Sequence, residues 1–321
     1  MTPRTPGPPP PAGPPPARGI TMLGASEAGK TSFLAALQIA LLRQPDLGWS
    51  LTGDDQGSTL AMIGFMDAMS NQHAFPQPTV IRHENYRWSL IGEIPGVREW
   101  HWWGFRRRTR RIRISLDLVD GPGEASRGSN LLATTESEEL VNSLARSAGI
   151  VLFFDPVLEA ERGHAFQHLY GVLTLLRSQA APHGKLPHFV AFCINKFDAV
   201  PIFRSAQALR ILQYDEETGA PYVPGEYALE FFERLITRSR SDDASMIMPL
   251  LRQTFHEDRI RFFVTSAIGF YIDPAIREFD PADYQNHIPG KPARIRGGVY
   301  PINVIEPVLW LGRIVARMAG S

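Results

Sequence analysis

Residues 24–31 have the sequence Gly-Ala-Ser-Glu-Ala-Gly-Lys-Thr and stand between a short apolar stretch and a segment dense in Ala and Leu. The pattern G-x-x-x-x-G-K-[ST] between a strand and a helix is typical of a loop whose backbone N–H groups converge, because glycine accepts backbone angles that other residues rarely adopt. Such a loop, backed by the positive end of the helix dipole, binds phosphate. The sequence therefore predicts a strand over 19–23, a phosphate loop and a helix over 31–42.

The end of this loop supplies two side chains with chemistry of their own. Lys30 is expected to bridge the β- and γ-phosphates of a nucleotide, and the hydroxyl of Thr31 to ligate Mg²⁺. An ordinary Gly-rich turn with an exposed lysine is the alternative, and the flanking strand and helix count against it. The other positions expected to line the phosphates are Gly24, Ser26, Glu27, Ala28, Gly29 and Ser32.

Beyond the loop, apolar strands alternate with helical patterns, which predicts an α/β fold: three layers, α-β-α, around a mostly parallel sheet with one antiparallel edge hairpin. The further strands are expected over 80–91, 112–119, 150–154, 189–194 and 260–264. The further helices are expected over 58–70, 136–148, 165–177, 226–238 and 305–318.

Composition narrows the class of protein. The 321 residues carry no net charge and a single cysteine, which argues against a nucleic-acid-coating protein and excludes a disulfide framework or a cysteine-rich zinc module. With no secretory signal and no apolar run near the roughly 20 residues of a membrane helix, a cytoplasmic protein is expected. The 29 arginines against four lysines indicate a GC-rich, bacterial genome.

The chain divides at residue 18. Residues 1–18 hold nine of the 27 prolines, which predicts a disordered Pro-rich tail, either a solvating leader or an SH3-type ligand. Residues 19–321 predict a single domain. Four stretches exceed what its strands and helices need, so we expect insertions near 45–75, 94–110, 213–225 and 270–300.

A second motif ends the strand over 112–119. Asp120 at the strand tip can hold Mg²⁺, and the N–H of Gly123 can approach a γ-phosphate because no Cβ intervenes. Alone, D-x-x-G is equally an ordinary Asp-Gly-Pro-Gly turn. Its weight comes from its position, one hairpin after the phosphate loop.

Two further motifs each follow a buried strand. In Asn195-Lys196-Phe197-Asp198, the carboxylate of Asp198 can accept hydrogen bonds from guanine N1–H and the 2-amino group, which adenine does not offer together. The stem of Lys196 can lie on the purine face, and Asn195 can tie this loop to the phosphate loop. In Thr265-Ser266-Ala267, a small residue lets a backbone N–H reach guanine O6.

In this order the four motifs resemble a Ras-like G domain of the translation-factor-related (TRAFAC) class of P-loop GTPases, over about residues 19–318. Residues 22–24, 31–37 and 120–124 are similar, more narrowly, to bacterial GTPases of the double-GTPase group, which occur in signalling and conflict systems. The resemblance implies GTP/GDP and Mg²⁺ as ligands, hydrolysis of GTP to GDP and phosphate, and the role of a regulatory nucleotide-dependent switch.

The resemblance also implies a switch I threonine just before the second strand. Thr79 fits best, because Thr59 lies in an expected helix and Thr52 lies far from any expected strand. Glu124 stands where Ras-like proteins commonly have a glutamine that orients the attacking water, which leaves the intrinsic rate open but not nucleotide binding. The expected catalytic residues are Lys30, Thr79, Gly123 and Glu124, and the expected metal ligands are Thr31, Thr79 and Asp120.

Tryptophan and arginine interleave between residues 98 and 113. Such a segment can stack on nucleic acid, dock on anionic lipid or anchor a protein partner, or it is a solvated hairpin tip whose tryptophans pack down. An unknown protein effector or regulator at Trp100–Arg113 is the preferred functional reading, nucleic acid is disfavoured, and a homodimer is left open. The alternative function, favoured by Glu124, is a nucleotide-bound scaffold with little hydrolysis that works through partner binding at this segment.

Two other features predict core rather than chemistry. Cys193 lies inside an apolar strand and is expected to be inert. The methionines of the helix over 58–70 (Met62, Met66 and Met69) are expected to pack into the core.

Overall fold

The structure, a computed structural model, describes residues 19–25, 27–76, 86–101, 104–120, 141–163, 165–180, 184–237 and 242–318. The expected Pro-rich tail (residues 1–18), Ser26, Thr79, Gly123 and Glu124 lie outside these residues. For residues 94–101, 104–108, 120, 162, 165, 175, 176 and 178–180, the structure describes the backbone only.

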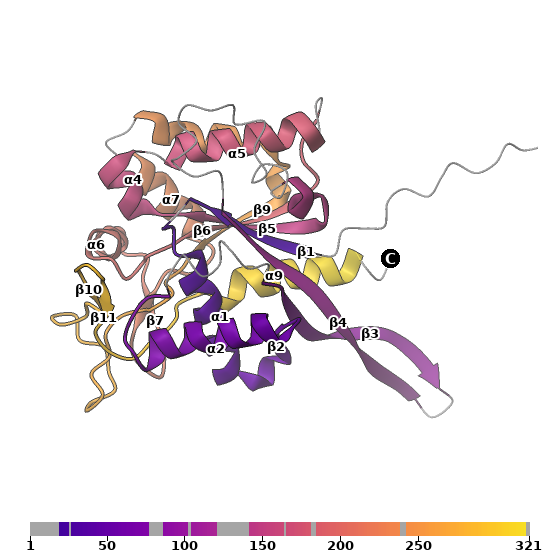
Figure 1. The fold of residues 1–321 in the computed structure, drawn as a ribbon, viewed down its shortest axis with the longest axis horizontal. Helices are drawn as coiled ribbons and strands as arrows, with labels where there is room; N and C mark the ends of the chain where they lie inside the picture. The colour runs from indigo at the N-terminus through magenta and orange to yellow at the C-terminus, as the bar shows by residue number, and fades with distance from the viewer. Residues whose placement is uncertain are drawn as a thin grey trace, which may run out of the picture.

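A seven-stranded sheet runs through the middle of the described chain, with strand order β2-β3-β4-β1-β5-β6-β9 (Figure 1). Strands β4, β1, β5, β6 and β9 are parallel to one another, whereas β2–β3 and β3–β4 are antiparallel pairs. The expected mostly parallel sheet with an antiparallel hairpin is confirmed. The strands are β1 (Gly19–Gly24), β2 (Trp49–Gly53), β3 (Trp88–His101), β4 (Gly104–Asp120), β5 (Ser147–Phe154), β6 (Phe189–Ile194) and β9 (Ile260–Val264).

Helices cover both faces of the parallel part, which gives the expected three layers (Figure 1). On one face lie α1 (Lys30–Arg43), α2 (Gln56–Ser70) and α9 (Ile305–Met318). The other face carries α4 (Pro156–Arg162), α5 (Ala165–Ala180), α6 (Val200–Leu209), α7 (Ala228–Ile236) and α8 (Ile247–Thr254). None of the helices in the described ranges combines the length and the hydropathy that a membrane-spanning segment requires.

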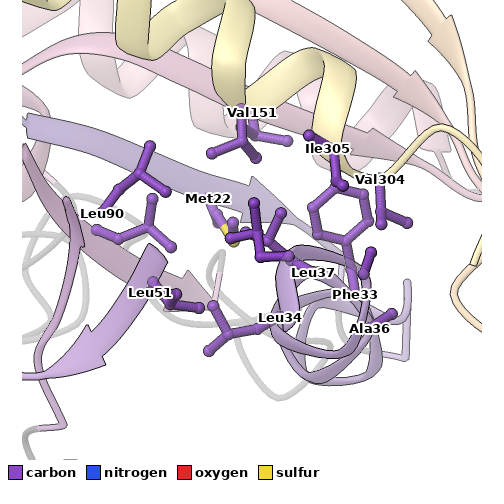
Figure 2. Close-up of a cluster of buried hydrophobic side chains, with 14 of the residues drawn as sticks. Met22, Phe33, Leu34, Ala36, Leu37, Leu51, Leu90, Val151, Val304 and Ile305 are labelled. Carbon is purple, nitrogen blue, oxygen red and sulfur yellow. The ribbon is translucent and has the colours of Figure 1, made fainter. Parts of the chain in front are cut away.

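Side chains of the parallel strands alternate between two hydrophobic clusters, one on each face. Met22 and Val151 point toward α1 and α9, where they meet Phe33 and Ile305 (Figure 2). The neighbouring Leu152 belongs to the cluster on the opposite face. Burial on both faces explains why these strands are continuous apolar runs in the sequence.

The residues expected to be inert are in the core. Cys193 is fully buried in β6, and burial raises the pKa of its thiol. Met62 and Met69 are buried, and Met66 packs against the same cluster. The expectation that these side chains lie in the core is confirmed.

Strand β2 is a difference from the sequence prediction. It pairs with β3 alone, so it is the edge of the sheet, and the antiparallel hairpin β3–β4 lies one strand inside it. Its alternating pattern, with Trp49 and Leu51 buried and Ser50 and Thr52 exposed, is that of a strand with one covered face. Thr52 therefore lies within a strand, contrary to expectation.

The hairpin β3–β4 is also longer than expected. Strand β3 begins at Trp88, not at residue 80, and pairing continues outward until His101 faces Gly104. The stretch 94–110, expected to be an insertion, continues the two strands away from the body of the molecule (Figure 1). Near its base, Ile112 and Ile114 are buried and Arg113 is exposed, because helices cover only one face there.

The helix expected over 136–148 ends earlier. Residues 141–145 are helical, but β5 begins at Ser147. Ser147 pairs with Gly19 of β1, and Gly149 pairs with Ile20. The hydroxyl of Thr21 in β1 forms hydrogen bonds with Ser143 (2.9 Å) and Ser147 (2.7 Å), which joins this helix end to the strand. The local helical pattern is therefore overridden by pairing with β1.

We predict that His188 makes the stability of the protein depend on pH. Its imidazole is buried and Nε2 donates to the carbonyl oxygen of Leu144 (3.0 Å), and burial lowers its pKa from the ordinary 6.5. As pH falls below 6.5 the unfolded chain takes up a proton before the folded one does, so stability present above that pH is lost on the way down to the folded pKa. The urea concentration at the midpoint of unfolding should therefore decrease when the pH is lowered from 7.5 to 5.5, and this decrease should be smaller in His188→Asn.

His256→Asn is the matched control for this measurement, since His256 is exposed. It should keep the pH dependence of the wild type. An undiminished fall in His188→Asn would contradict the assignment to His188.

Candidate functional site

The phosphate loop lies between the end of β1 and the start of α1. Glu27 and Gly29 have φ angles of 66° and 86°, which turn the chain back on itself before Lys30. A Cβ at Gly29 would lie 2.8 Å from the amide nitrogen of Asn195, and a Cβ at Gly24 would lie 2.8 Å from the Cβ of Phe153. The loop therefore needs glycine at both ends for close packing.

The side chain of Lys30 runs back across this loop. Its Nζ donates hydrogen bonds to the carbonyl oxygens of Gly24 and Ala25, both at 2.8 Å, and the residue is buried. The ammonium group is thereby held within the loop. An anion bound by the N–H groups of the loop and the first turn of α1 would meet it there.

The second motif is brought to the same edge of the sheet. Strands β1 and β4 are parallel, and Gly24 stands opposite Asp120 in their register. Thr31, the second residue of α1, is half-buried beside the loop. The backbone thus places the start of D-x-x-G next to the phosphate loop, while the roles expected of Gly123, Glu124 and Thr79 stay predictions.

Asn195 joins three loops. Its Nδ2 donates to the carbonyl oxygen of Ala28 (2.8 Å), and its Oδ1 accepts from the hydroxyl of Thr265 (3.3 Å). The side chain is buried between them. The structure therefore contains the bond expected between the N-K-x-D loop and the phosphate loop, and a further bond to the loop after β9.

Asp198 and Ser266 form a second polar pair beside Asn195. The Ser266 hydroxyl donates to Oδ1 of Asp198 (2.5 Å) and accepts from the N–H of Gly269 (2.8 Å). Burial raises the pKa of Asp198, and the bond from Ser266 opposes that rise. The carboxylate is thus fixed in orientation beyond the carboxyl end of β6, next to Ser266.

Asp155 is a functional candidate that sequence reasoning missed. It follows β5, is buried, and its Oδ1 caps α4 by accepting from the N–H groups of Val157 and Leu158 (3.0 Å each). Its Oδ2 lies 2.5 Å from Nζ of Lys196. The helix cap therefore also positions the lysine of N-K-x-D. An Asp followed by Pro at the end of an apolar run is a helix-start signal that could have identified it.

A cavity of about 230 Å³ opens beside Asp198. Its inner side is Asp198 and the first turn of α6, Ala199 to Pro201, and its outer side is Gln285, His287 and Pro289. The outer residues come from the stretch 270–300, expected only to be an insertion. No motif in the sequence marks these three residues, because the tertiary fold, and not their sequence position, brings them next to Asp198.

Comparison with protein-family models and with curated protein sequences found no match. Among solved structures, the chain is similar to Sup35 complexed with GDP (TM-score 0.30, 13% identity, 78% of this chain and 36% of that chain) and with GMPPNP (0.29, 16%, 78% and 37%). It is also similar to an ADP-ribosylation-factor-like GTP-binding protein, the small COPII coat GTPase SAR1 from Encephalitozoon cuniculi, in complex with GDP (0.28, 12%, 78% and 70%). The chain spans little more than a third of the Sup35 chains.

We predict that Asn195→Ala weakens both the fold and the site. It leaves the buried Ala28 carbonyl without its Asn195 donor and removes one of the two acceptors of the Thr265 hydroxyl, which costs about 1–3 kcal/mol of unfolding free energy. Urea denaturation measures this loss. Asn71→Ala removes an exposed amide that donates to Asp67, so it should cost about 0.5 kcal/mol or less. Equal losses in the two variants would show that the three-loop junction contributes nothing special.

Proposed function

We propose that this protein binds GTP and GDP as a Ras-like P-loop GTPase and works as a nucleotide-dependent switch. The observation that carries the proposal is the buried side chain of Asn195, which links the phosphate loop to the loops that hold Asp198 and Ser266. A ligand that suits this arrangement is a single nucleotide with its phosphates at the phosphate loop and its base at the loops of Asp198 and Ser266. Assignment to the bacterial double-GTPase group and a cytoplasmic location belong to the same proposal.

The base is proposed to be guanine because of the groups at the carboxyl ends of β6 and β9. A fixed carboxylate at Asp198 accepts from N1–H and the 2-amino group of guanine, and a backbone N–H at Ala267 donates to O6. Adenine has an acceptor at N1 and a donor at C6, so both interactions would be reversed.

Mg²⁺ fits the donors that this edge of the sheet offers. Thr31, the second residue of α1, offers a hydroxyl beside the loop, and Asp120 stands opposite Gly24. Hydroxyl and carboxylate oxygens are hard ligands of the kind that Mg²⁺ prefers together with phosphate oxygens. Thr31, Asp120 and Thr79 would hold the ion, which when bound neutralises phosphate charge.

The reaction proposed is in-line attack of water on the γ-phosphate, giving GDP and phosphate. Lys30, held inside the loop, offsets negative charge that develops on the phosphate oxygens. Glu124 is the candidate group facing the water, and the Gly123 N–H the candidate γ-phosphate contact. GTP would order Thr79 and residues 121–136, and hydrolysis would release them.

A nucleotide-bound scaffold with little turnover is the second candidate. It is favoured by the hairpin β3–β4, which continues as paired strands beyond the body of the molecule (Figure 1). A partner bound along Trp100–Arg113 would then be the functional output. A homodimer through this hairpin is the related option.

We predict that Asp198→Asn lowers the affinity for GDP by about 100-fold or more and raises the affinity for xanthosine diphosphate. The carboxamide can donate to the 2-oxo group of xanthine but offers only one acceptor to guanine. Competition against a fluorescent guanine nucleotide measures both affinities. Asp46→Asn, which changes an exposed carboxylate, is the matched control. Unchanged GDP affinity in Asp198→Asn would remove Asp198 from the base site.

We predict that the wild-type protein with Mg²⁺ hydrolyses GTP to GDP in a single-turnover assay and leaves ATP unhydrolysed. Lys30→Ala should lower nucleotide affinity or turnover by about 100-fold or more, because the charge at the phosphates is lost. Lys185→Ala removes an exposed lysine and should behave as the wild type. Tight GTP binding without turnover would favour the scaffold, and equal binding of ATP would contradict the guanine assignment.

A further inference from the structure

A small hairpin borders the site on its outer side. It consists of β10 (His287–Ile288) and β11 (Arg294–Ile295), paired antiparallel, and the chain entering it supplies Gln285. Gln285 and His287 face Asp198 across the cavity of about 230 Å³. Two exposed polar side chains thus stand opposite the carboxylate that selects the base.

This hairpin is fixed to the loop that follows β9. Asn286, which lies between the two cavity residues, is buried and donates to the carbonyl oxygens of Ile268 (3.1 Å) and Gly298 (3.0 Å). Its Oδ1 accepts from the N–H of Gly297 (2.9 Å). Because side chains alternate along an extended chain, anchoring Asn286 inward directs Gln285 and His287 to the cavity side.

Aromatic packing fixes the hairpin to the helix on the inner side of the cavity. Tyr284 packs against Phe203 of α6, with ring centroids 4.8 Å apart, and against Phe270 at 5.9 Å. Helix α6 begins directly after Asp198 and Ala199. The two sides of the cavity are therefore held at a set separation by one buried cluster.

The imidazole of His287 is in turn supported from the other side. It lies 5.8 Å, centroid to centroid, from the ring of Phe75. The chain before Phe75 is bound to β11, through the N–H of Ile295 and the carbonyl oxygen of His73 (2.8 Å). His287 is therefore an ordered part of the cavity wall.

The position of the cavity relates it to one edge of the base. In guanine, O6 and the 2-amino group lie on opposite sides of N1. If O6 faces the N–H of Ala267, the 2-amino group points away from residues 265–268. The cavity lies against Asp198, the proposed acceptor of N1–H and the 2-amino group, and its wall contains none of residues 265–268, all of which the structure describes.

We propose that Gln285 and His287 form the side of the nucleobase pocket that receives the exocyclic 2-amino group, and that they add to guanine specificity. The proposal rests on the proposed function and deepens it. The side-chain oxygen of Gln285 accepts an amino hydrogen that Asp198 leaves unused. The imidazole of His287 forms the adjoining part of the pocket wall.

His287 also acts on Asp198 electrostatically. Burial is the largest influence on the pKa of Asp198 and raises it, whereas charge on His287 is among the influences that lower it. The hairpin thus favours the ionised carboxylate on which guanine binding depends.

The test compares GDP with inosine diphosphate, which lacks the 2-amino group, by competition against a fluorescent guanine nucleotide. The variants are Gln285→Ala and His287→Ala, both at exposed positions, so folding should be retained. The control is Ile288→Ala, an exposed residue of the same hairpin outside the cavity wall. The preference of the wild type for GDP over inosine diphosphate should fall roughly 5- to 10-fold in the two cavity variants and stay constant in the control.

The outcomes separate the two proposals. If the wild type fails to bind GDP, the proposed function is wrong and this inference falls with it. If the wild type binds GDP but both cavity variants keep its preference for GDP, or lose affinity equally for both nucleotides, the inference alone is overturned. A preference reduced in one variant only supports the hairpin as a pocket wall and assigns the amino contact to that residue.

Discussion

The amide of Asn195 donates to the carbonyl oxygen of Ala28, a residue 167 positions earlier in the chain, and the rest of the site depends on this contact. The amide occupies the space that a side chain at Gly29 would fill, so the loop can approach only because residue 29 is glycine. The same amide accepts from Thr265, which brings in the loop after β9. One buried side chain therefore sets the distance between the phosphate loop and the loops after β6 and β9, which hold Asp198 and Ser266.

Parallel strands make this junction achievable at one edge of the sheet. The carboxyl ends of β1, β4, β5, β6 and β9 lie together, so each loop that follows them starts from the same edge. Asp155, which follows β5 at this edge, both caps α4 and forms an ion pair with Lys196. The hairpin β10–β11 is the exception, because it is not anchored by a strand of the main sheet and depends instead on Asn286 and Tyr284.

Sequence reasoning worked where local pattern and burial agree. Strands β6 and β9 and helix α9 have the bounds expected from the sequence, since strongly apolar or amphipathic segments fix them. It failed where long-range contacts decide: β2 is only five residues long and depends on β3 for pairing, and α4, α6 and α8 are short helices stabilised by packing. Gln285 and His287 reach the site through buried contacts of their neighbours, which no local motif encodes.

The two core clusters differ in their aromatic residues, and this has a spectroscopic consequence. The three tryptophans whose side chains the structure describes, Trp49, Trp88 and Trp310, all belong to or pack against the cluster under α1 and α9. The opposite cluster contains many phenylalanines, including a packed set on α6 and α7, and phenylalanine emits almost nothing when tryptophan is excited. Emission from these three indoles reports on the half of the core that supports the phosphate loop. Loosening of the opposite cluster, which packs under α5 to α8, would leave the emission of these three tryptophans nearly unchanged.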